Sequence, residues 1–294
     1  MVTQRTAKSF KDPCVTQSET LPQVLLARAK STPGALAERH KRLGIWREFT
    51  WSDVLDSVRA LALGLENLGL STGDSVMMIG ENEPEHFWAE YAVQSLGGKV
   101  LSVYPDQNAE EILYLAEDSQ TRIFLAQDQE QVDKCIEVAS KYSGALAIIY
   151  WDDSGLWNYD HPLLHSFETV SAAGRQNHAK EPARFEEHVK RGRADDIALL
   201  SYTSGTTGNP KGVVYHHRGA YLNASSNIIG WNLGHHPTYL WTLPMFHCNG
   251  WCFPWTLAAK AGTNVCLRQV AAAPIIEAMT EHGVTHYCGA PIVH

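Results

Sequence analysis

Short apolar runs alternate with longer amphipathic stretches through the first half of the chain. The apolar runs, whose composition is typical of buried strands, occupy residues 75–79, 100–103, 122–126 and 145–150. Apolar residues at helical spacing predict helices between them, at residues 84–97, 108–118 and 129–141. This order favours βαβ units, and therefore an α/β fold in which helices cover both faces of a mainly parallel sheet.

The chain before this alternation predicts two helices and one strand. Residues 21–31 have the spacing of a short amphipathic helix, and residues 46–49 that of a short strand. A second helix is expected to begin at Thr50 or Ser52 and to end at Gly69, because hydroxyl residues favour helix starts and glycine favours helix ends.

Residues 152–194 lack this periodicity and are polar, with many histidines, glycines and arginines, which predicts a surface excursion or linker. A further strand follows Asp195. We therefore expect a flexible arm over 1–20, a first α/β subdomain over 21–194 that includes the excursion, and the start of a second α/β subdomain over 195–294.

Composition narrows the function classes. The 294 residues are 44% hydrophobic, enough for a large core, and the formal net charge of −8 argues against a nucleic-acid binder that relies on a basic face. Six cysteines without a paired spacing indicate reduced thiols and a cytoplasmic location. No apolar run approaches the roughly 18 residues that a transmembrane helix needs.

The stretch SYTSGTTGNPKGVVYHH concentrates residues that bind phosphate. Glycines let several backbone N–H groups approach one ligand, and hydroxyl groups donate to phosphate or ligate Mg²⁺. Pro210 fixes one φ angle and biases Asn209 toward extended geometry, while Lys211 supplies a positive charge. The glycines are Gly205, Gly208 and Gly212, and the nearby hydroxyl residues are Thr203, Ser204, Thr206 and Thr207.

A phosphate-binding loop, a flexible linker and an ordinary turn compete as interpretations of this stretch. The proline argues against a flexible linker, and the coincidence of glycines, hydroxyls, proline and lysine argues against an ordinary turn. A Walker loop has adjacent Gly-Lys followed by Ser or Thr, whereas Lys211 lies between Pro210 and Gly212. A phosphate loop of a different class from the P-loop NTPases is therefore favoured.

Two other patterns predict no chemistry. GLSTG at 69–73 matches the nucleophile elbow of hydrolases, but a helix precedes it and a strand follows it, the reverse of the elbow, so Ser71 is expected in a turn. Cys248 and Cys252 lack the second ligand pair that a zinc site requires.

YTSGTTGNPKG closely resembles the phosphate loop of the adenylate-forming, AMP-binding acyl-CoA synthetase family. LPMFHCNGWCFPWTLAAKAGTNVCLR, from Leu243 to Arg268, is similar to the segment that lines the acyl pocket of that family. The order and spacing of the two blocks agree, and the resemblance covers about residues 21–294. It implies the layered α-β-α large N-terminal domain of these enzymes.

The resemblance also implies roles for individual residues. His247 would orient the acyl carboxylate and, with Lys211, is the expected catalytic residue. Trp251 matches a tryptophan that gates the acyl tunnel in long-chain members, with ordinary core packing as the alternative, and Gly289 and Ala290 resemble another edge of that pocket. Thr203 would ligate Mg²⁺. The implied nucleotide-binding residues are Thr203, Ser204, Gly205, Thr206, Thr207, Gly208, Asn209, Pro210 and Lys211.

The implied activity is a two-step ligation that uses ATP, Mg²⁺ and CoA. A carboxylate attacks the α-phosphorus and releases pyrophosphate, and the thiol of CoA then displaces AMP. Residues 104–135 and 151–170 resemble long-chain or bubblegum-type members, whereas the chain from Tyr202 onward resembles the short- and medium-chain branch that includes methylthiopropionate-CoA ligases. The two parts imply different acyl lengths. Family analogy also implies a homodimer.

Some of the family's motifs are missing from the 294 residues. We find no aromatic-Gly-x-Thr-Glu motif, no ribose-binding aspartate motif, no hinge and no small C-terminal lid domain with its catalytic lysine. We therefore expect an N-terminal fragment that forms no acyl-CoA by itself. Two alternatives stay open: a non-catalytic nucleotide-binding fragment or pseudoenzyme, and an adenylating enzyme that passes the acyl group to an acceptor other than CoA.

Overall fold

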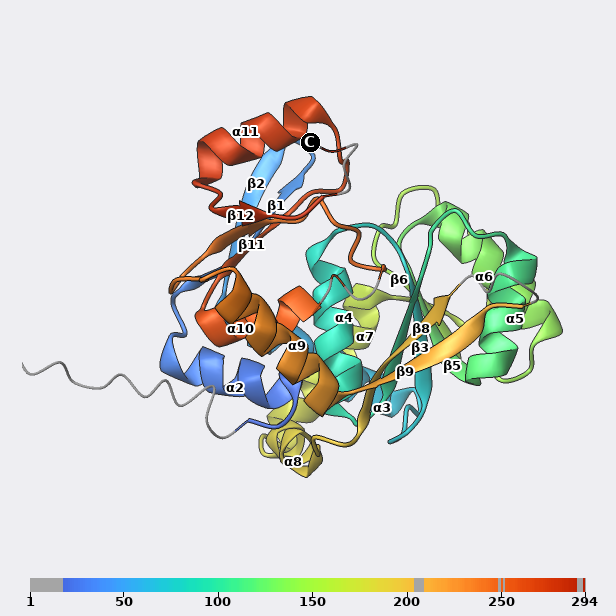
Figure 1. Ribbon diagram of the computed structural model, residues 1–294. Coiled ribbons are helices and arrows are strands. Elements are labelled where there is room, and N and C mark those ends of the chain that lie inside the picture. The colour runs from blue at the N-terminus through green and yellow to red at the C-terminus, as the bar shows by residue number, and fades with distance from the viewer. Residues whose placement is uncertain (1–17, 204–208, 248–249, 251, 290–292, 294) are drawn as a thin grey trace, which may run out of the picture.

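The computed structural model describes residues 18–203, 209–247, 250, 252–289 and 293. Two β-sheets organise these residues, one of seven strands and one of five (Figure 1). Helices pack on both faces of each sheet, which confirms the layered α/β fold expected from the sequence. No helix within the described residues is long and apolar enough to cross a membrane.

The seven-stranded sheet is parallel except for its last pair. Its strand order is β7-β6-β5-β3-β4-β8-β9, and β8 and β9 are antiparallel. The strands are β3 (Ser75–Ile79), β4 (Lys99–Val103), β5 (Thr121–Ala126), β6 (Ala147–Tyr150), β7 (Leu164–Ser166), β8 (Ile197–Thr203) and β9 (Lys211–His216).

Alternating side chains of this sheet enter two separate cores. Val76 and Met78 belong to the core on the side of α3 and α4, whereas Met77 and Ile79 belong to the core on the side of α5 and α6. Both faces are apolar because both are covered, which is why the sequence has continuous apolar runs here. The four helices are α3 (Trp51–Asn67), α4 (Pro84–Ser95), α5 (Ala109–Ser119) and α6 (Gln129–Lys141).

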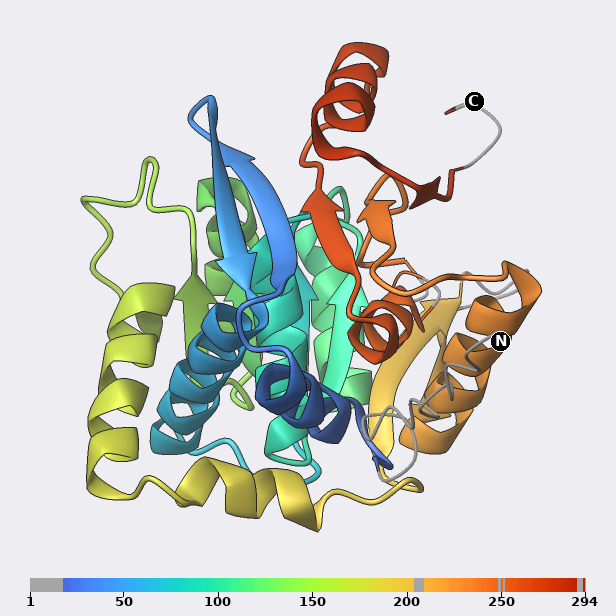
Figure 2. The same cartoon turned by 90° about the vertical axis from the view of Figure 1, so that its left-hand side faces the viewer.

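The five-stranded sheet joins the two ends of the chain. Its order is β12-β10-β11-β1-β2, and Figure 2 shows the blue hairpin of β1 and β2 beside the red strand β11. Helix α11 packs on one face, while α2, α9 and α10 contribute to the core on the other side. The elements are β1 (Leu36–Arg42), β2 (Ile45–Thr50), β10 (Thr238–Leu240), β11 (Thr263–Cys266), β12 (His286–Tyr287), α2 (Leu21–Ser31), α9 (His217–Gly230), α10 (Phe253–Lys260) and α11 (Ala272–His282).

Strand β1 has no counterpart in the sequence-based prediction. Its sequence, LAERHKR, places Glu38 and His40 at buried positions, so the apolar alternation that identifies a strand is missing. The indole N–H of Trp88 donates to Glu38, and His40 lies 3.7 Å from a carboxylate oxygen of Glu83. The hydrogen bond from Trp88 makes Glu38 acceptable inside the strand, and burial lowers the pKa of His40 to about 4, so that this side chain is buried in its neutral form.

The expected excursion at 152–194 is folded over most of its length. It contains β7, helix α7 (Phe167–Lys180) and helix α8 (Arg184–Arg191). Helix α7 lies directly against α3, because a Cβ on Gly174 would come 1.8 Å from the backbone oxygen of Ala60, and one on Gly64 would come 2.2 Å from that of Val170. Small residues make this contact possible, and they lower the apolar signal in the sequence.

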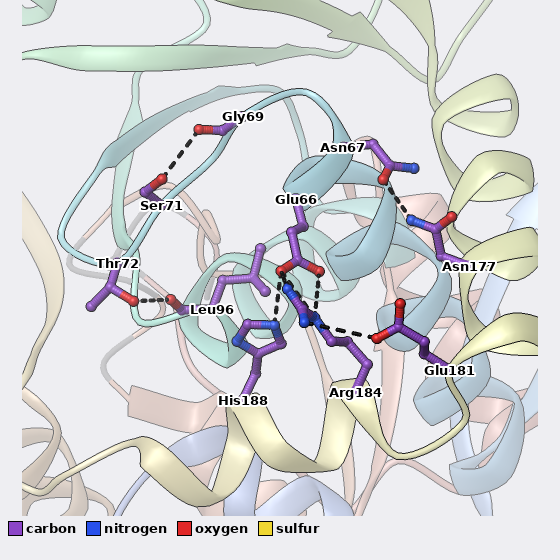
Figure 3. A network of polar contacts seen from close by, with 10 residues as sticks. All are labelled: Glu66, Asn67, Gly69, Ser71, Thr72, Leu96, Asn177, Glu181, Arg184 and His188. Atoms are coloured by element: carbon purple, nitrogen blue, oxygen red, sulfur yellow. Dashed lines mark hydrogen bonds and ion pairs between the residues drawn. The ribbon is translucent and has the colours of Figure 1, made fainter.

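Helix α8 is tied to the end of α3 by a group of polar contacts (Figure 3). Glu66 accepts hydrogen bonds from Arg184 at 2.6 Å and from His188 at 3.0 Å. Beside it, Asn177 of α7 donates to Asn67 at 2.5 Å. The segment is therefore held to the sheet-covering helices rather than extending into solvent.

The expected start of a second subdomain near Asp195 does not coincide with a boundary between the sheets. The seven-stranded sheet contains β8 and β9 from beyond that residue, and the five-stranded sheet contains β1 and β2 from before it. Each sheet therefore combines strands from both expected subdomains.

Candidate active site

The predicted phosphate loop connects the two antiparallel strands at the edge of the seven-stranded sheet. Thr203 at the end of β8 pairs with Lys211 at the start of β9. The two residues therefore face each other at the base of the loop. Ser204, Gly205, Thr206, Thr207 and Gly208 lie outside the described residues.

Helix α5 holds both sides of this hairpin. The hydroxyl of Tyr114 donates to the backbone oxygen of Pro210 at 2.9 Å, and the hydroxyl of Tyr202 donates to Asp118 at 2.5 Å. Gly212 pairs with Tyr202, and a Cβ at this position would lie 3.2 Å from the tyrosine ring. The base of the loop is thus braced by two tyrosines from neighbouring elements.

The exposed polar groups in the described part of the hairpin are of the kinds that bind a nucleoside triphosphate and its magnesium ion. Thr203, Asn209 and Lys211 are exposed, so a hydroxyl oxygen, an amide and an ammonium group meet solvent at one end of the sheet. Mg²⁺ commonly takes one or two protein oxygens and completes its shell with phosphate and water. The donor set fits Mg²⁺ bound to phosphate, in which case Thr203 would be the protein ligand and Lys211 the counter-charge.

The segment that leads to His247 is held by one buried side chain. Asn82, which follows β3, donates to the backbone oxygens of Trp241 at 2.9 Å and Leu243 at 2.8 Å, and it accepts from the backbone N–H of Met245 at 2.7 Å. One amide group thus fixes the backbone at three points just before His247.

His247 itself contacts the residue after β4. The hydroxyl of Tyr104 lies 2.5 Å from the Nδ1 atom of His247, and the two rings are 5.6 Å apart. The ring of Phe246 lies 5.0 Å from that of Tyr104 in an edge-to-face arrangement. In parallel α/β sheets, ligand sites form beyond the carboxyl ends of the strands, which is where Tyr104 lies.

A small cavity of about 20 Å³ connects the phosphate-loop hairpin with the His247 segment. Phe246 and Cys252 form one wall, and strands β4, β8 and β9 form the others. Its strand residues are Val100, Ser102, Leu199, Leu200, Ser201 and Tyr215. The two blocks that the sequence singled out are therefore neighbours in space.

Gly289 follows strand β12, which pairs with the strand that leads toward His247. Thr242 donates to the backbone oxygen of Cys288, the residue before Gly289. Because β10 runs parallel to β12, the segments that follow these two strands leave the sheet at the same edge. Trp251 and Ala290 fall outside the described residues. The structure therefore places the chain before Gly289 against the chain that leads to His247, and the acyl pocket itself remains a prediction.

Ser71 lies in the turn between α3 and β3, as the sequence predicts, and its backbone N–H donates to Asp74. Within the described part of the chain, no group of three or more histidine, cysteine or acidic residues could hold a metal ion. Cys252 is buried, and Cys248 lies outside the described residues.

A cluster of ionic groups adjoins Asn82. Arg268, which follows β11, lies within 3.6 Å of carboxylate oxygens of Glu83, Asp128 and Asp152. These acids follow β3, β5 and β6, so Arg268 connects the five-stranded sheet to the carboxyl edge of the seven-stranded one. Burial raises the pKa of nearby Glu81 above its usual value.

Sequence reasoning missed Asn82, Tyr104 and Arg268. All three lie just beyond the end of a predicted or observed strand, and polar residues at strand ends were the available signal. Their partners lie more than a hundred residues away in sequence, so the contacts themselves carry no local pattern.

The fold defines a layered α/β protein, and a braced hairpin at the edge of its larger sheet carries the loop that has a phosphate-binding composition. A sequence profile described as "AMP-binding enzyme" matches residues 25–294. The chain therefore belongs to the AMP-binding enzyme family.

Curated relatives of this chain are CoA ligases. It is 36% identical over 258 residues to a peroxisomal acetate/butyrate–CoA ligase of Arabidopsis thaliana, a match that covers 84% of this chain and 44% of that protein. It is also 36% identical to a peroxisomal benzoate–CoA ligase of the same plant, covering 83% and 42%. The chain thus spans less than half the length of these relatives.

Solved structures agree on the fold. A putative long-chain-fatty-acid CoA ligase from Rhodopseudomonas palustris superposes with a TM-score of 0.77 at 22% identity, covering 94% of this chain and 64% of that chain. The N-terminal domain of FACL13 from Mycobacterium tuberculosis gives a TM-score of 0.74, covering 93% and 63%. At such low identity these matches carry the fold alone.

Proposed function

We propose that the protein is an acid–thiol ligase that activates a carboxylic acid with ATP and transfers the acyl group to CoA. In the first step a carboxylate oxygen bonds to the α-phosphorus of ATP and pyrophosphate leaves. In the second step the thiol sulfur bonds to the acyl carbon, AMP leaves, and the thiol proton passes to solvent. Membership of the AMP-binding family supports this reaction class.

One observation carries the proposal: the loop with the phosphate-binding composition is closed by the pairing of Thr203 with Lys211, and its hairpin shares a cavity with the segment before His247. Phosphoryl chemistry at a charged centre depends mainly on positioning and charge stabilisation. Lys211 would neutralise phosphate charge, Thr203 would ligate Mg²⁺, and His247 would orient the carboxylate. Bound Mg²⁺ would draw negative charge from the phosphate oxygens.

We further propose a short aliphatic or small aromatic acid as substrate. The relatives are named for acetate, butyrate and benzoate, which are all small acids. The likeness of residues 104–135 to long-chain members makes a fatty acid the second candidate. Thioester formation with acids from acetate to palmitate, and with benzoate, distinguishes the two.

The test uses the full-length enzyme and ATP–pyrophosphate exchange. Lys211→Ala should lower exchange at least about tenfold through weaker use of ATP, and His247→Ala should slow adenylate formation by a similar factor, since each removes a positioned polar contact. Lys141→Ala is the matched control, because Lys141 is an exposed lysine on α6 paired with Glu137. Exchange at the control rate in both site variants would remove the proposed site.

The compartment and assembly are proposals as well. The reduced cysteines favour the cytoplasm, whereas the relatives named as peroxisomal make that organelle the alternative. A homodimer remains the expectation by family analogy. Cell fractionation tests the compartment. Light scattering of the purified protein tests whether it is a homodimer.

A further inference from the structure

Two contacts from the seven-stranded sheet converge on His247. Asn82, at the end of β3, fixes the backbone of residues 241–245, and Tyr104, at the end of β4, contacts the imidazole. The backbone N–H of His247 donates to the oxygen of Pro244, which adds a turn to this segment. Both the backbone and the ring of His247 are therefore positioned by residues from outside its own segment.

The contact with Tyr104 is specific to one edge of the ring. The phenol oxygen lies 2.5 Å from Nδ1, and Phe246 packs edge-to-face against Tyr104 from the same side, at 5.0 Å between ring centres. Asn82 is only 2% exposed, so the backbone that carries both aromatic residues is anchored in the core. The Nε2 atom consequently lies on the edge of the imidazole opposite Tyr104.

A tyrosine hydroxyl can donate to an imidazole nitrogen or accept from it, so the direction of this contact decides the tautomer. A neutral tyrosine hydroxyl has one proton to donate, and an imidazole nitrogen that accepts it carries no proton of its own. In a neutral imidazole the proton then resides on the other nitrogen, because the hydrogen bond made by one ring nitrogen sets the state of the second.

We propose that Tyr104 is a positioning residue that holds His247 as the Nε2–H tautomer, so that Nε2 donates to the carboxylate of the acid substrate. The opposite tautomer would turn a lone pair toward the negatively charged carboxylate and repel it. The inference rests on the proposed function, because the carboxylate is the substrate of that reaction.

The first measurement is independent of activity. In ¹⁵N-labelled protein above the pH at which histidine is protonated, the ring shifts of His247 should show mainly the Nε2–H form, with assignment by His247→Gln. Tyr104→Phe keeps the ring and removes the hydroxyl, and should shift the population toward the other tautomer. Tyr159→Phe is the matched control, since the Tyr159 hydroxyl bonds to Asp133 and Gln129 at a distant surface.

The second measurement is ATP–pyrophosphate exchange by the full-length enzyme. Tyr104→Phe should lower kcat about tenfold, the scale of one hydrogen bond, with the KM for ATP and the melting temperature close to those of Tyr159→Phe. Identical tautomer populations in the wild type and Tyr104→Phe, or exchange by Tyr104→Phe at the control rate, would each overturn the inference. Absence of exchange by the wild type would instead reject the proposed function, while the ring shifts still decide whether Tyr104 sets the tautomer.

Discussion

Glu38 is a carboxyl group inside strand β1, only 2% exposed, and its environment determines its protonation. Burial raises its pKa to about 8, the indole N–H of Trp88 lowers it in part, and the carboxylate of Glu85 raises it further. Near neutral pH the folded protein therefore holds a neutral acid here. A neutral carboxyl still accepts the hydrogen bond from Trp88, which keeps that indole satisfied.

Replacing Glu38 by Gln should make stability less dependent on pH. Because the pKa of Glu38 is higher in the folded state than its ordinary value of 4.5, its contribution is fully present below pH 4.5 and is lost as pH rises through about 8. The stability of Glu38→Gln relative to the wild type should therefore rise by more than about 1 kcal/mol between pH 5 and pH 8. Urea unfolding at both pH values measures this difference.

The control for this prediction is Glu110→Gln, since Glu110 is an exposed acid on α5. Its stability relative to the wild type should stay constant between the same pH values. If Glu38→Gln behaves in the same way as Glu110→Gln, Glu38 is ionised in the folded protein and the assignment is wrong.

At the scale of the element, the contact between α3 and α7 depends on two glycines. Gly64 and Gly174 allow the backbones of the two helices to meet, since a Cβ on either residue would overlap carbonyl oxygens of the opposite helix. Side chains in both helices complete the same core, with Leu61 and Leu65 on α3 and Val170 on α7. This contact holds the chain from 167 to 191 in place.

Gly174→Ala should separate the two helices. The added methyl group meets the backbone oxygen of Ala60, which cannot rotate away, and overpacking of this kind costs about 1–3 kcal/mol. Gly230→Ala is the matched control, because nothing lies within 4 Å of a Cβ at that helical position, and alanine there should be neutral or stabilising. Equal melting temperatures for the two variants would refute the close contact.

The attachment of α8 depends on Glu66. The hydrogen bond from Arg184 is the main cause that lowers the pKa of Glu66 below its ordinary 4.5. A lowered pKa gives stability that is present above the ordinary value and is lost as pH falls through the folded value. Glu66→Gln should therefore cost about 1 kcal/mol at neutral pH, with partial exposure of Arg184 limiting the effect, and the cost should vanish in acid.

The melting temperatures of the wild type and Glu66→Gln, measured between pH 7 and pH 3, test this prediction. Glu137→Gln serves for comparison, because the pair of Glu137 with Lys141 is exposed on both sides and should contribute little. A loss in Glu66→Gln that persists unchanged at pH 3 would show that packing, rather than the ion pair, holds α8.

How far the sequence predicted the elements depended on the residues that fill each position. The strands from β3 to β6 and the helices α3 to α6 were predicted because apolar residues occupy most of their buried positions. Strand β1 was missed because two of its buried positions hold Glu38 and His40, which carry no apolar signal. Helix α7 was missed because glycine and serine make its contact surface, and these residues carry no apolar signal.

The residues of the candidate site remain a prediction. Family resemblance supplied Lys211, Thr203 and His247, and the structure brings the hairpin and the His247 segment to one cavity. Tyr104 and Asn82 could not be predicted, because their roles consist of contacts across more than 140 residues of chain. Only the strand order, in which β4 lies between β3 and β8, makes those contacts visible.

At the scale of the whole molecule, the sequence lacks groups that the proposed reaction requires. The 294 residues contain no aromatic-Gly-x-Thr-Glu motif, and they span less than half the length of the curated relatives. We therefore predict that this chain by itself forms no acyl-CoA from ATP, CoA and butyrate, whereas the full-length enzyme does. A thiol-consumption assay on both measures it, and turnover by the 294-residue chain alone would contradict the prediction.

The five-stranded sheet has a consequence for how the protein is made on the ribosome. Glu38 of β1 pairs with Asn264 of β11, so the first hairpin leaves the exit tunnel long before its partner strand exists. At translation speeds of about 5–20 residues per second, that wait lasts roughly 10–45 s. Throughout it, the side of β1 that later pairs with β11 stays an open strand edge, whereas Trp88, the partner of Glu38, follows only 50 residues later.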